Sequence, residues 1–452
     1  MDSIKKFYNV CEFGIIGDGK TNNTESIAKV IDVAASNGGG TIYFPAGEYV
    51  TGTIELKSNM TLYLDSGCVI LGSDNPSDYP MITRETLKGY NREGHSGLIK
   101  ALNCENITVT GRGVIDGRGY NWWDNPKNEH RPRAIQPILC DNVLIEGITV
   151  KNSAMWTVHP ICCNNVTISS ITIKNPSDSP NTDGINPESC SNVHISNCTV
   201  DVGDDCVTLK SGTEDDDLQK QHPCENIVIT NCTMLNGHGG VVIGSEMSGG
   251  VKNVVISNCV FSGTDRGIRI KTRRKRGGYI EDVVISNILM DKVLVPFVIN
   301  GYYQCGGASA DDMSLFSLEK LEVSVNTPVI RNINISNISA KNVIASAGYI
   351  CGIPEMPVEG LTLSNYNVKM ADTDGEPKDK PIMAFHAPKT RGEGIHCANI
   401  KDSIFRDISV KIISGNGFEL ENADNIFVYG LRSEGGEKAI DIKNSENVQI
   451  NE

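Results

Sequence analysis

The sequence has few of the features that mark membrane proteins, zinc ribbons or nucleic-acid-binding proteins. Its N-terminal residues include no apolar run long enough for a signal peptide, and no later segment could span a bilayer. Aromatic residues make up only 6% of the 452 residues, and no Cys-x-x-Cys pair occurs. The net charge of −14 makes nucleic acid and anionic membranes poor partners. We therefore expect neither nucleic-acid nor membrane binding.

The cysteines do not form the compact pattern of a disulfide framework. They number fifteen, an odd count, and are scattered through strand-like segments. We expect them to be buried, reduced thiols of a cytoplasmic protein. A secreted protein whose signal peptide has been removed would show the same pattern.

A short phrase led by asparagine recurs from about residue 106 to the end of the sequence. Four of the steps between its copies are 23, 27, 27 and 29 residues, the range expected of a solenoid. Each copy contains short, alternating, β-branched strands that bury an apolar face only by stacking on neighbours. The sequence therefore predicts an all-β fold, a parallel β-helix. The leading residues are Asn106, Asn142, Asn165, Asn192, Asn226, Asn253, Asp282, Asn332 and Asn447.

A second asparagine recurs inside these phrases, in the tripeptides SNC, TNC and SNI. Asparagine tolerates left-handed backbone angles, so a stacked asparagine turn is expected here in preference to glycan sites. The cysteines that follow three of them, Cys198, Cys232 and Cys259, are expected to fill the core as small apolar groups. The asparagines are Asn197, Asn231, Asn258, Asn287 and Asn337.

The first sixty residues have a different pattern, with an amphipathic helix in TESIAKVIDVAASNGGG that can close the open end of a solenoid. Thr24 is the candidate N-cap. We expect one domain over 1–452, with an N-terminal cap region at 1–60 and β-helix coils at 61–452. The helix carries Ile27, Val30, Ile31 and Ala34 on one face.

Residues 14–21, GIIGDGKT, match the phosphate-loop pattern G-x-x-x-x-G-K-T, which raises ATP hydrolysis as a rival function. Nucleotide folds need alternating strands and helices, and no such alternation follows residue 40. We interpret the match as a glycine turn that leads into the cap helix, with nucleotide binding as the alternative.

Two adjacent carboxylates interrupt a strand-like run in VGDDCVTLK. Side chains on a strand alternate between faces, so either Asp204 or Asp205 would point into the core, where an unpaired aspartate is costly. We therefore expect a bend at Gly203 that turns both acids outward onto a groove.

Other unusual polar residues follow this pair at intervals of about one coil. The successive separations from Asp183 to Asp205, His238, Arg269 and Tyr303 are 22, 33, 31 and 34 residues. Arg269 and Lys271 alternate with isoleucines and should face the same side of a strand. Two cations beside three aspartates suggest a ligand that carries carboxylates.

A basic run at 266–276 contains seven cations and no acid. For its last four residues, 273–276, a solvated loop is as plausible as a functional role. Nucleic acid is the less plausible ligand, because no stacking aromatics are interleaved with the cations.

The motifs NTDG, GDDC, GHGG and RIK, in this order, resemble the polygalacturonase family, glycoside hydrolase family 28, and the likeness covers nearly the whole chain. The resemblance implies a right-handed parallel β-helix, no cofactor or metal, and inverting hydrolysis of the α-1,4 bonds between galacturonic acids in pectin. GDD stands where the family more often has NDD or QDD, which we interpret as a tolerated variant.

The resemblance also implies roles for the acids. Asp204 would be the general acid, Asp183 and Asp205 would hold and activate water, and His238 would tune the acid's surroundings. An inverting glycosidase needs carboxyl groups roughly 6.5–9.5 Å apart, a gap that acids on neighbouring coils could provide.

By the same resemblance Arg269 and Lys271 would clamp a galacturonate carboxylate. Tyr303 would bind substrate, although the adjacent Tyr302 leaves that assignment open. The basic run and the loop GSEMSGG resemble bacterial exo-acting members. We therefore expect action from a chain end on short oligogalacturonides, with further cations of the run holding the substrate.

Two alternatives stay open. A pectate-lyase-like enzyme would need calcium, which the acids Asp215, Asp216 and Asp217 could hold, although a solvated loop is the commoner meaning of such a run. A noncatalytic carbohydrate-binding β-helix would bind polyuronate without turnover. The sequence leaves the exact pectic sugar and the oligomeric state open.

Overall fold

The structure is a computed structural model that groups the chain into two compact units, Met1–Asp204 (unit 1) and Asp205–Glu452 (unit 2). That the chain is one domain stays a prediction. Among the described residues, no helix is both long and apolar enough to cross a membrane. The described residues are 6–87, 93–124, 130–216, 222–305, 312–372, 376–377 and 379–451.

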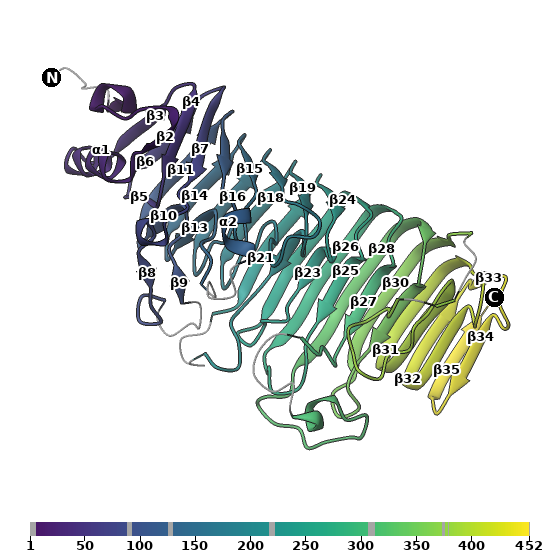
Figure 1. Cartoon of the computed structure of the whole chain (residues 1–452). Helices are drawn as coiled ribbons and strands as arrows, with labels where there is room; N and C mark the ends of the chain where they lie inside the picture. The colour runs from purple at the N-terminus through teal and green to yellow at the C-terminus, as the bar shows by residue number, and fades with distance from the viewer. Residues whose placement is uncertain are drawn as a thin grey trace. The chain divides into compact units, whose positions relative to one another are not determined.

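Unit 1 consists of short strands that pair in parallel with strands of the next coil, in three ladders (Figure 1). The first ladder contains β1 (Phe7–Asn9), β3 (Gly40–Phe44), β6 (Met60–Leu64), β11 (Glu105–Gly111), β14 (Asp141–Glu146), β16 (Asn164–Ser169) and β18 (Ser191–Ser196). The second contains β2 (Asp18–Asn22), β4 (Gly47–Thr51), β7 (Cys68–Gly72), β12 (Val114–Asp116), β15 (Thr149–Lys151), β17 (Thr172–Lys174) and β19 (Thr199–Val202).

The third ladder of unit 1 is shorter and comprises β5 (Ile54–Leu56), β10 (Ile99–Leu102) and β13 (Ile135–Ile138). Isolated parallel bridges continue it through Val158 and Ile185. The remaining elements are η1 (Val10–Phe13), α1 (Thr24–Ser36), η2 (Pro76–Asp78), β8 (Met81–Ile82), β9 (Gly94–His95) and α2 (Tyr120–Trp123).

Unit 2 has longer strands, several of which take part in two ladders (Figure 1). One ladder, here called the site ladder, carries Arg269 and Lys271 of the predicted site. It contains β20 (Val207–Leu209), β23 (Gly239–Ile243), β25 (Arg266–Lys271), β27 (Val295–Asn300) and β29 (Ser346–Cys351), and then the first residues of β31 (Glu393–Lys411) and β32 (Phe418–Tyr429) and β34 (Ile440–Lys443).

The other strands of unit 2 stack in the same parallel manner. They are β21 (Cys224–Thr230), β22 (Thr233–Asn236), β24 (Val251–Ser262), β26 (Tyr279–Asp291), β28 (Val329–Val343), β30 (Val358–Met370), β33 (Arg432–Glu434) and β35 (Glu446–Asn451), with η3 (Met313–Phe316) in a connection. Each unit is thus built of parallel coils, and the prediction of an all-β parallel β-helix is confirmed.

The recurring asparagines occupy the backbone positions that the sequence predicted. The nine leading residues have φ between 50° and 58°, and the five asparagines of the embedded tripeptides have φ between 55° and 58°. Their side chains also bond along the stack: Asn142 Nδ2 donates to Asn106 Oδ1 at 2.7 Å, and Asn253 Nδ2 donates to Asn226 Oδ1 at 3.0 Å. The leading and the embedded asparagines therefore mark left-handed backbone positions that recur in successive coils.

The cysteines and the cap helix also follow the sequence analysis. All fifteen cysteines are free thiols and twelve are buried, among them Cys198, Cys232 and Cys259 at 2% exposure. The predicted apolar face of α1 is buried. The expected cap was wrong by one residue, because Thr24 is the first helical residue and Asn23 occupies the cap position.

The phosphate-loop match is a turn whose amides are already bonded. The Asp18 carboxylate accepts hydrogen bonds from the backbone N–H groups of Lys20 at 2.9 Å and Thr21 at 2.7 Å. These are the groups that would have to face a phosphate. The geometry supports a turn ahead of α1 and disfavours nucleotide binding.

Candidate active site

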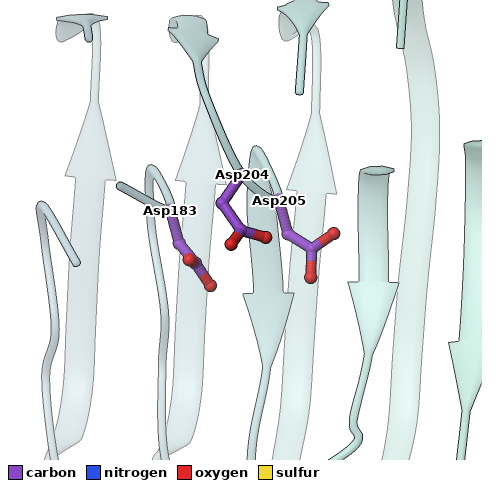
Figure 2. Close-up of side chains that lie close together, drawn as sticks. All are labelled: Asp183, Asp204 and Asp205. Carbon is purple, nitrogen blue, oxygen red and sulfur yellow. The ribbon is translucent and has the colours of Figure 1, made fainter. Parts of the chain in front are cut away.

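Two of the predicted acids lie at the end of unit 1. Asp183 follows a turn, is 3% exposed, and its Oδ2 accepts a hydrogen bond of 2.9 Å from Asn186 Nδ2. Asp204 is half-buried, and a carboxylate oxygen of each acid lies within 4.8 Å of the other. Figure 2 shows both side chains, with Asp205 as the next residue of the chain. The sequence analysis did not identify Asn186, although it stands only three residues after Asp183.

The chain bends between strand β19 (Thr199–Val202) and Asp204. Strand β19 ends at Val202, and Gly203 follows it without a side chain. A Cβ on Gly203 would lie 2.6 Å from the carbonyl oxygens of both Pro176 and Ser179, so the close backbone approach requires glycine. The predicted bend at this residue is confirmed.

Asp205, the first residue of unit 2, lies in an ion-pair cluster. Its Oδ1 is 3.1 Å from Arg269 Nη1, and its Oδ2 is 2.7 Å from Lys271 Nζ. The expectation that both acids face outward was wrong for Asp205, which is only 1% exposed. Two cations neutralise it, which is how a carboxylate can be buried at all.

The cluster also sets the ionisation state of Asp205. Burial raises the pKa of Asp205, but the charges of Lys271 and Arg269 outweigh burial and hold that pKa well below its ordinary value. Asp205 therefore stays an anion at any pH at which the fold is expected to work.

Arg269 and Lys271 lie on the same side of β25, as their alternation predicted, since both contact Asp205. The isoleucines that alternate with them, Ile268 and Ile270, are buried. Tyr303 completes this cationic group: its ring centroid is 5.0 Å from Lys271 Nζ and 5.5 Å from the Arg269 guanidinium carbon.

The adjacent tyrosine has different neighbours. Tyr302 is fully buried and its ring lies 5.5 Å from the guanidinium carbon of Arg274. Of the two tyrosines, Tyr303 is thus the one that joins the predicted site.

His238 is exposed and lies in the bend between β22 and β23. Its neighbour Gly239 borders the ion-pair cluster, because a Cβ on Gly239 would come within 3.1 Å of Asp205 Oδ1. The GHGG motif therefore reaches the predicted site, and a glycine is needed where its backbone passes Asp205.

The end of the basic run has a different environment from the one expected. Arg273 Nη2 lies 2.8 Å from Glu214 Oε1, Arg276 also pairs with Glu214, and all three groups belong to unit 2. Arg274 forms a two-pronged ion pair with Glu355, with bonds of 2.5 and 2.8 Å. These three arginines, here called the loop arginines, are at most 5% exposed.

A solvated loop was therefore wrong for the loop arginines, whose charges are paired inside the protein. Lys275 alone of the four is exposed, and it pairs with Asp312 at 2.5 Å. The sequence analysis missed both Glu214 and Glu355, since no local pattern connects them to the arginines.

The acids could in principle hold a cation, because Asp183, Asp204 and Asp205 form the one group of potential metal ligands found among the described residues. The two cations on Asp205 reduce the negative charge that a metal would need. In the acidic loop Asp216 Oδ2 accepts a hydrogen bond from Thr213 N at 2.6 Å, and Asp217 lies outside the described residues. The geometry therefore gives a calcium-dependent reaction little support.

The comparisons with known proteins agree with the motifs. The sequence model of glycosyl hydrolases family 28 matches residues 42–384, a range that contains every predicted site residue. A probable polygalacturonase of Vitis vinifera is 35% identical over 376 residues, which are 80% of this chain and 74% of that protein. The exo-poly-alpha-D-galacturonosidase of Dickeya chrysanthemi is 30% identical over 350 residues, 66% of this chain and 57% of that protein.

Solved structures give the same result. The crystal structure of a hyperthermoactive exopolygalacturonase from Thermotoga maritima is 32% identical and superposes with a TM-score of 0.70. The match covers 81% of this chain and 87% of that one.

Proposed function

Because the chain belongs to glycosyl hydrolases family 28, we propose that it hydrolyses the α-1,4 bonds between galacturonic acid residues, working from a chain end. Family membership makes it a glycosidase, as the sequence predicted. Two similar proteins at 30% and 32% identity carry names that specify exo action on galacturonan, which supports the finer assignment.

The observation that carries the proposal is the ion-pair cluster at Asp205. Consecutive Cα atoms are about 3.8 Å apart, so the buried anion Asp205 always has Asp204 beside it in the chain. Asp204 in turn lies within 4.8 Å of Asp183. The three acids thus have three different environments. Asp205 stays ionised, Asp204 is partly exposed to solvent, and Asp183 is hydrogen-bonded to Asn186.

These environments support different roles. A general acid must carry a proton before it reacts, which the depressed pKa of Asp205 excludes for that residue. Asp204 is half-buried, so part of its side chain is accessible to a substrate, and we assign it the general acid. Asp183 and Asp205 are assigned to holding and activating water, and His238 to the surroundings of the acid.

The cations supply the binding of substrate charge. Arg269 and Lys271 together carry two positive charges, and both form ion pairs with the carboxylate of Asp205. Beside the ring of Tyr303, these two cations suit a galacturonate carboxylate through charge-assisted hydrogen bonds. The loop arginines pair with Glu214 and Glu355, which are not among the predicted site residues, and are assigned no substrate.

The spacing of the acids bears on the stereochemistry. The nearest oxygens of Asp183 and Asp204 are closer, at no more than 4.8 Å, than the roughly 6.5–9.5 Å expected for the carboxyl groups of an inverting enzyme. The division of roles, with Asp204 as the acid and Asp183 and Asp205 holding water, is that of an inverting enzyme. We propose that the reaction proceeds with inversion.

Digestion of galacturonate oligomers of known length tests the proposal. Exo action releases one small product from the outset, whereas a ladder of intermediate lengths in the first minutes would show endo action. Proton NMR of the first product reports its anomer, and initial retention would overturn the inverting mechanism. New absorbance from an unsaturated product would show a lyase, and binding without turnover would favour a noncatalytic β-helix.

A further inference from the structure

Unit 2 contains a pocket of about 330 Å³ that the proposed reaction does not use. Most of its lining follows residue 384, where the family match ends. The pocket lies over β29, β31 and β32, on coils beyond those that carry the cations of the proposed site.

The pocket belongs to the same strand ladder as Arg269. In the register of the site ladder, Arg269 pairs with Val298, Val298 with Tyr349, Tyr349 with His396, and His396 with Glu419. At about 4.8 Å between strands, Tyr349 is about 10 Å and Glu419 about 19 Å along the ladder from Arg269. An oligosaccharide that is held at Arg269 and extends along this ladder would reach the pocket.

The charge of the pocket is opposite to that of the proposed site. Three carboxylates line it, those of Glu393, Glu419 and Glu421, and its lining includes no lysine or arginine among the described residues. Burial, together with the charge of Glu419, raises the pKa of Glu393 to about 7. A galacturonate carboxylate would meet repulsion here, whereas at Lys271 and Arg269 it would meet attraction.

Several polar and aromatic groups in the pocket are held in place. The ring of Tyr349 stacks on that of His396, with centroids 4.6 Å apart and planes 29° apart. His396 Nδ1 lies 3.2 Å from Glu419 Oε2, and Asn416 Nδ2 donates to Glu419 Oε1 at 2.7 Å. Fixed acceptors beside aromatic rings in a concave site can fix the orientation of a hydroxyl-rich ligand.

A bound cation is the less suitable occupant of so acidic a pocket. Within the described part of the chain, the one group of three or more potential metal ligands that lie close together is the three aspartates of the proposed site. The acids of the pocket do not form such a group, which favours their use as hydrogen-bond acceptors for hydroxyl groups.

We infer that this acidic pocket is a binding subsite for an uncharged, hydroxyl-rich sugar residue of the substrate chain. The inference rests on the proposed function, since it takes the substrate to be a galacturonate chain held at Arg269. It implies that the enzyme prefers chains that carry a neutral sugar at one end over chains of galacturonate alone.

Three hexasaccharides test the inference: hexagalacturonate, and two hexamers in which galactose, the uncharged counterpart, replaces the two residues at one end or at the other. Their dissociation constants are measured by calorimetry on the Asp204→Asn protein. We expect one of the galactose-ended hexamers to bind about 10-fold more tightly than hexagalacturonate, the effect of roughly one hydrogen bond to a charged group.

The variant Glu421→Lys should remove this preference or reverse it, because the new cation attracts a carboxylate. Glu437→Lys makes the same charge change at an exposed position outside the pocket lining and should keep the preference. If Glu421→Lys does not fold, Glu421→Gln should still reduce the ratio of the dissociation constant of hexagalacturonate to that of the preferred galactose-ended hexamer. Equal binding of all three hexamers, or a ratio that changes equally in the two lysine variants, would overturn the inference.

Measuring hydrolysis distinguishes a failure of this inference from a failure of the proposed function. If the wild-type protein cleaves trigalacturonate but the binding ratios show no preference, the inference fails and the proposed function stands. If no galacturonate oligomer is cleaved, the proposed function fails, while the calorimetric ratios still decide what the pocket binds.

Discussion

The positive residues of the basic run belong to two regions with different environments. Arg269 and Lys271 lie on β25 and share one buried carboxylate, whereas Arg273, Arg274 and Arg276 follow the strand and pair with acids from distant connections. The first group contacts Asp205 and Tyr303 of the predicted site. The second group pairs with Glu214 and Glu355, which are not among the predicted site residues. A run of cations in a sequence therefore does not indicate how many of them are available to a ligand.

The largest expected effect lies at Asp204, the residue that precedes Asp205 in the chain. Asp204→Asn keeps the shape of the side chain and removes the proton that a general acid donates. We expect turnover to fall by roughly 10²–10⁴-fold or more, with unfolding and substrate binding nearly unchanged. The rate on trigalacturonate and the dissociation constant by calorimetry check this. Near-normal turnover would refute the role of Asp204.

The second group should respond in stability and not in activity. Arg274→Met leaves the buried carboxylate of Glu355 without its partner, which should lower the free energy of unfolding by about 3–5 kcal/mol. Turnover of short oligomers at a temperature where the variant is folded should stay near the wild-type value. Urea unfolding and steady-state rates provide the two measurements.

A double variant serves as the control for that pair. Arg274→Met combined with Glu355→Gln removes both charges and should recover much of the lost stability. If Arg274→Met has the wild-type free energy of unfolding but binds oligomers weakly, this arginine belongs to the substrate site. The contrast between the two groups would then no longer hold.

Acid should weaken the first group over a defined pH range. The folded-state pKa of Asp205 is depressed below the ordinary 3.8, so its contribution to stability is present above that value. It is lost as the pH falls toward the folded pKa. We expect the stability difference between wild type and Asp205→Asn to be constant from pH 7 to pH 5 and to shrink below about pH 4. A difference that grows on acidification would contradict the ion-pair cluster.

The smallest effect is expected at a lysine that has neither role. Lys20 lies in the turn that resembles a phosphate loop, where Asp18 already accepts the backbone N–H groups. Lys20→Ala should change the free energy of unfolding by no more than about 0.5 kcal/mol and leave turnover unchanged. ATP binding by the wild type that disappears in this variant would overturn that interpretation.

The positions of the site residues could be predicted in part. Alternation along a strand predicted that Arg269 and Lys271 lie on the same side. The cost of burying an unpaired aspartate predicted the bend at Gly203. The burial of Asp205 was not predicted, because alternation along a strand says which side a residue faces and not what covers it. The choice between Tyr302 and Tyr303 likewise depended on which ring lies beside Lys271.

The sequence by itself determined that the chain folds into the stacked coils of a parallel β-helix. Each asparagine at a corner indicates a left-handed backbone position, and each β-branched strand indicates an apolar face that is buried by stacking on its neighbours. Both signals are local properties of the chain. Only the tertiary structure decided which charges are neutralised. Arg273 and Arg274 find their acids 59 and 81 residues away, and no pattern within one coil encodes a pairing over that separation. Burial makes such pairs necessary, because an unpaired charge in the interior is too costly to keep.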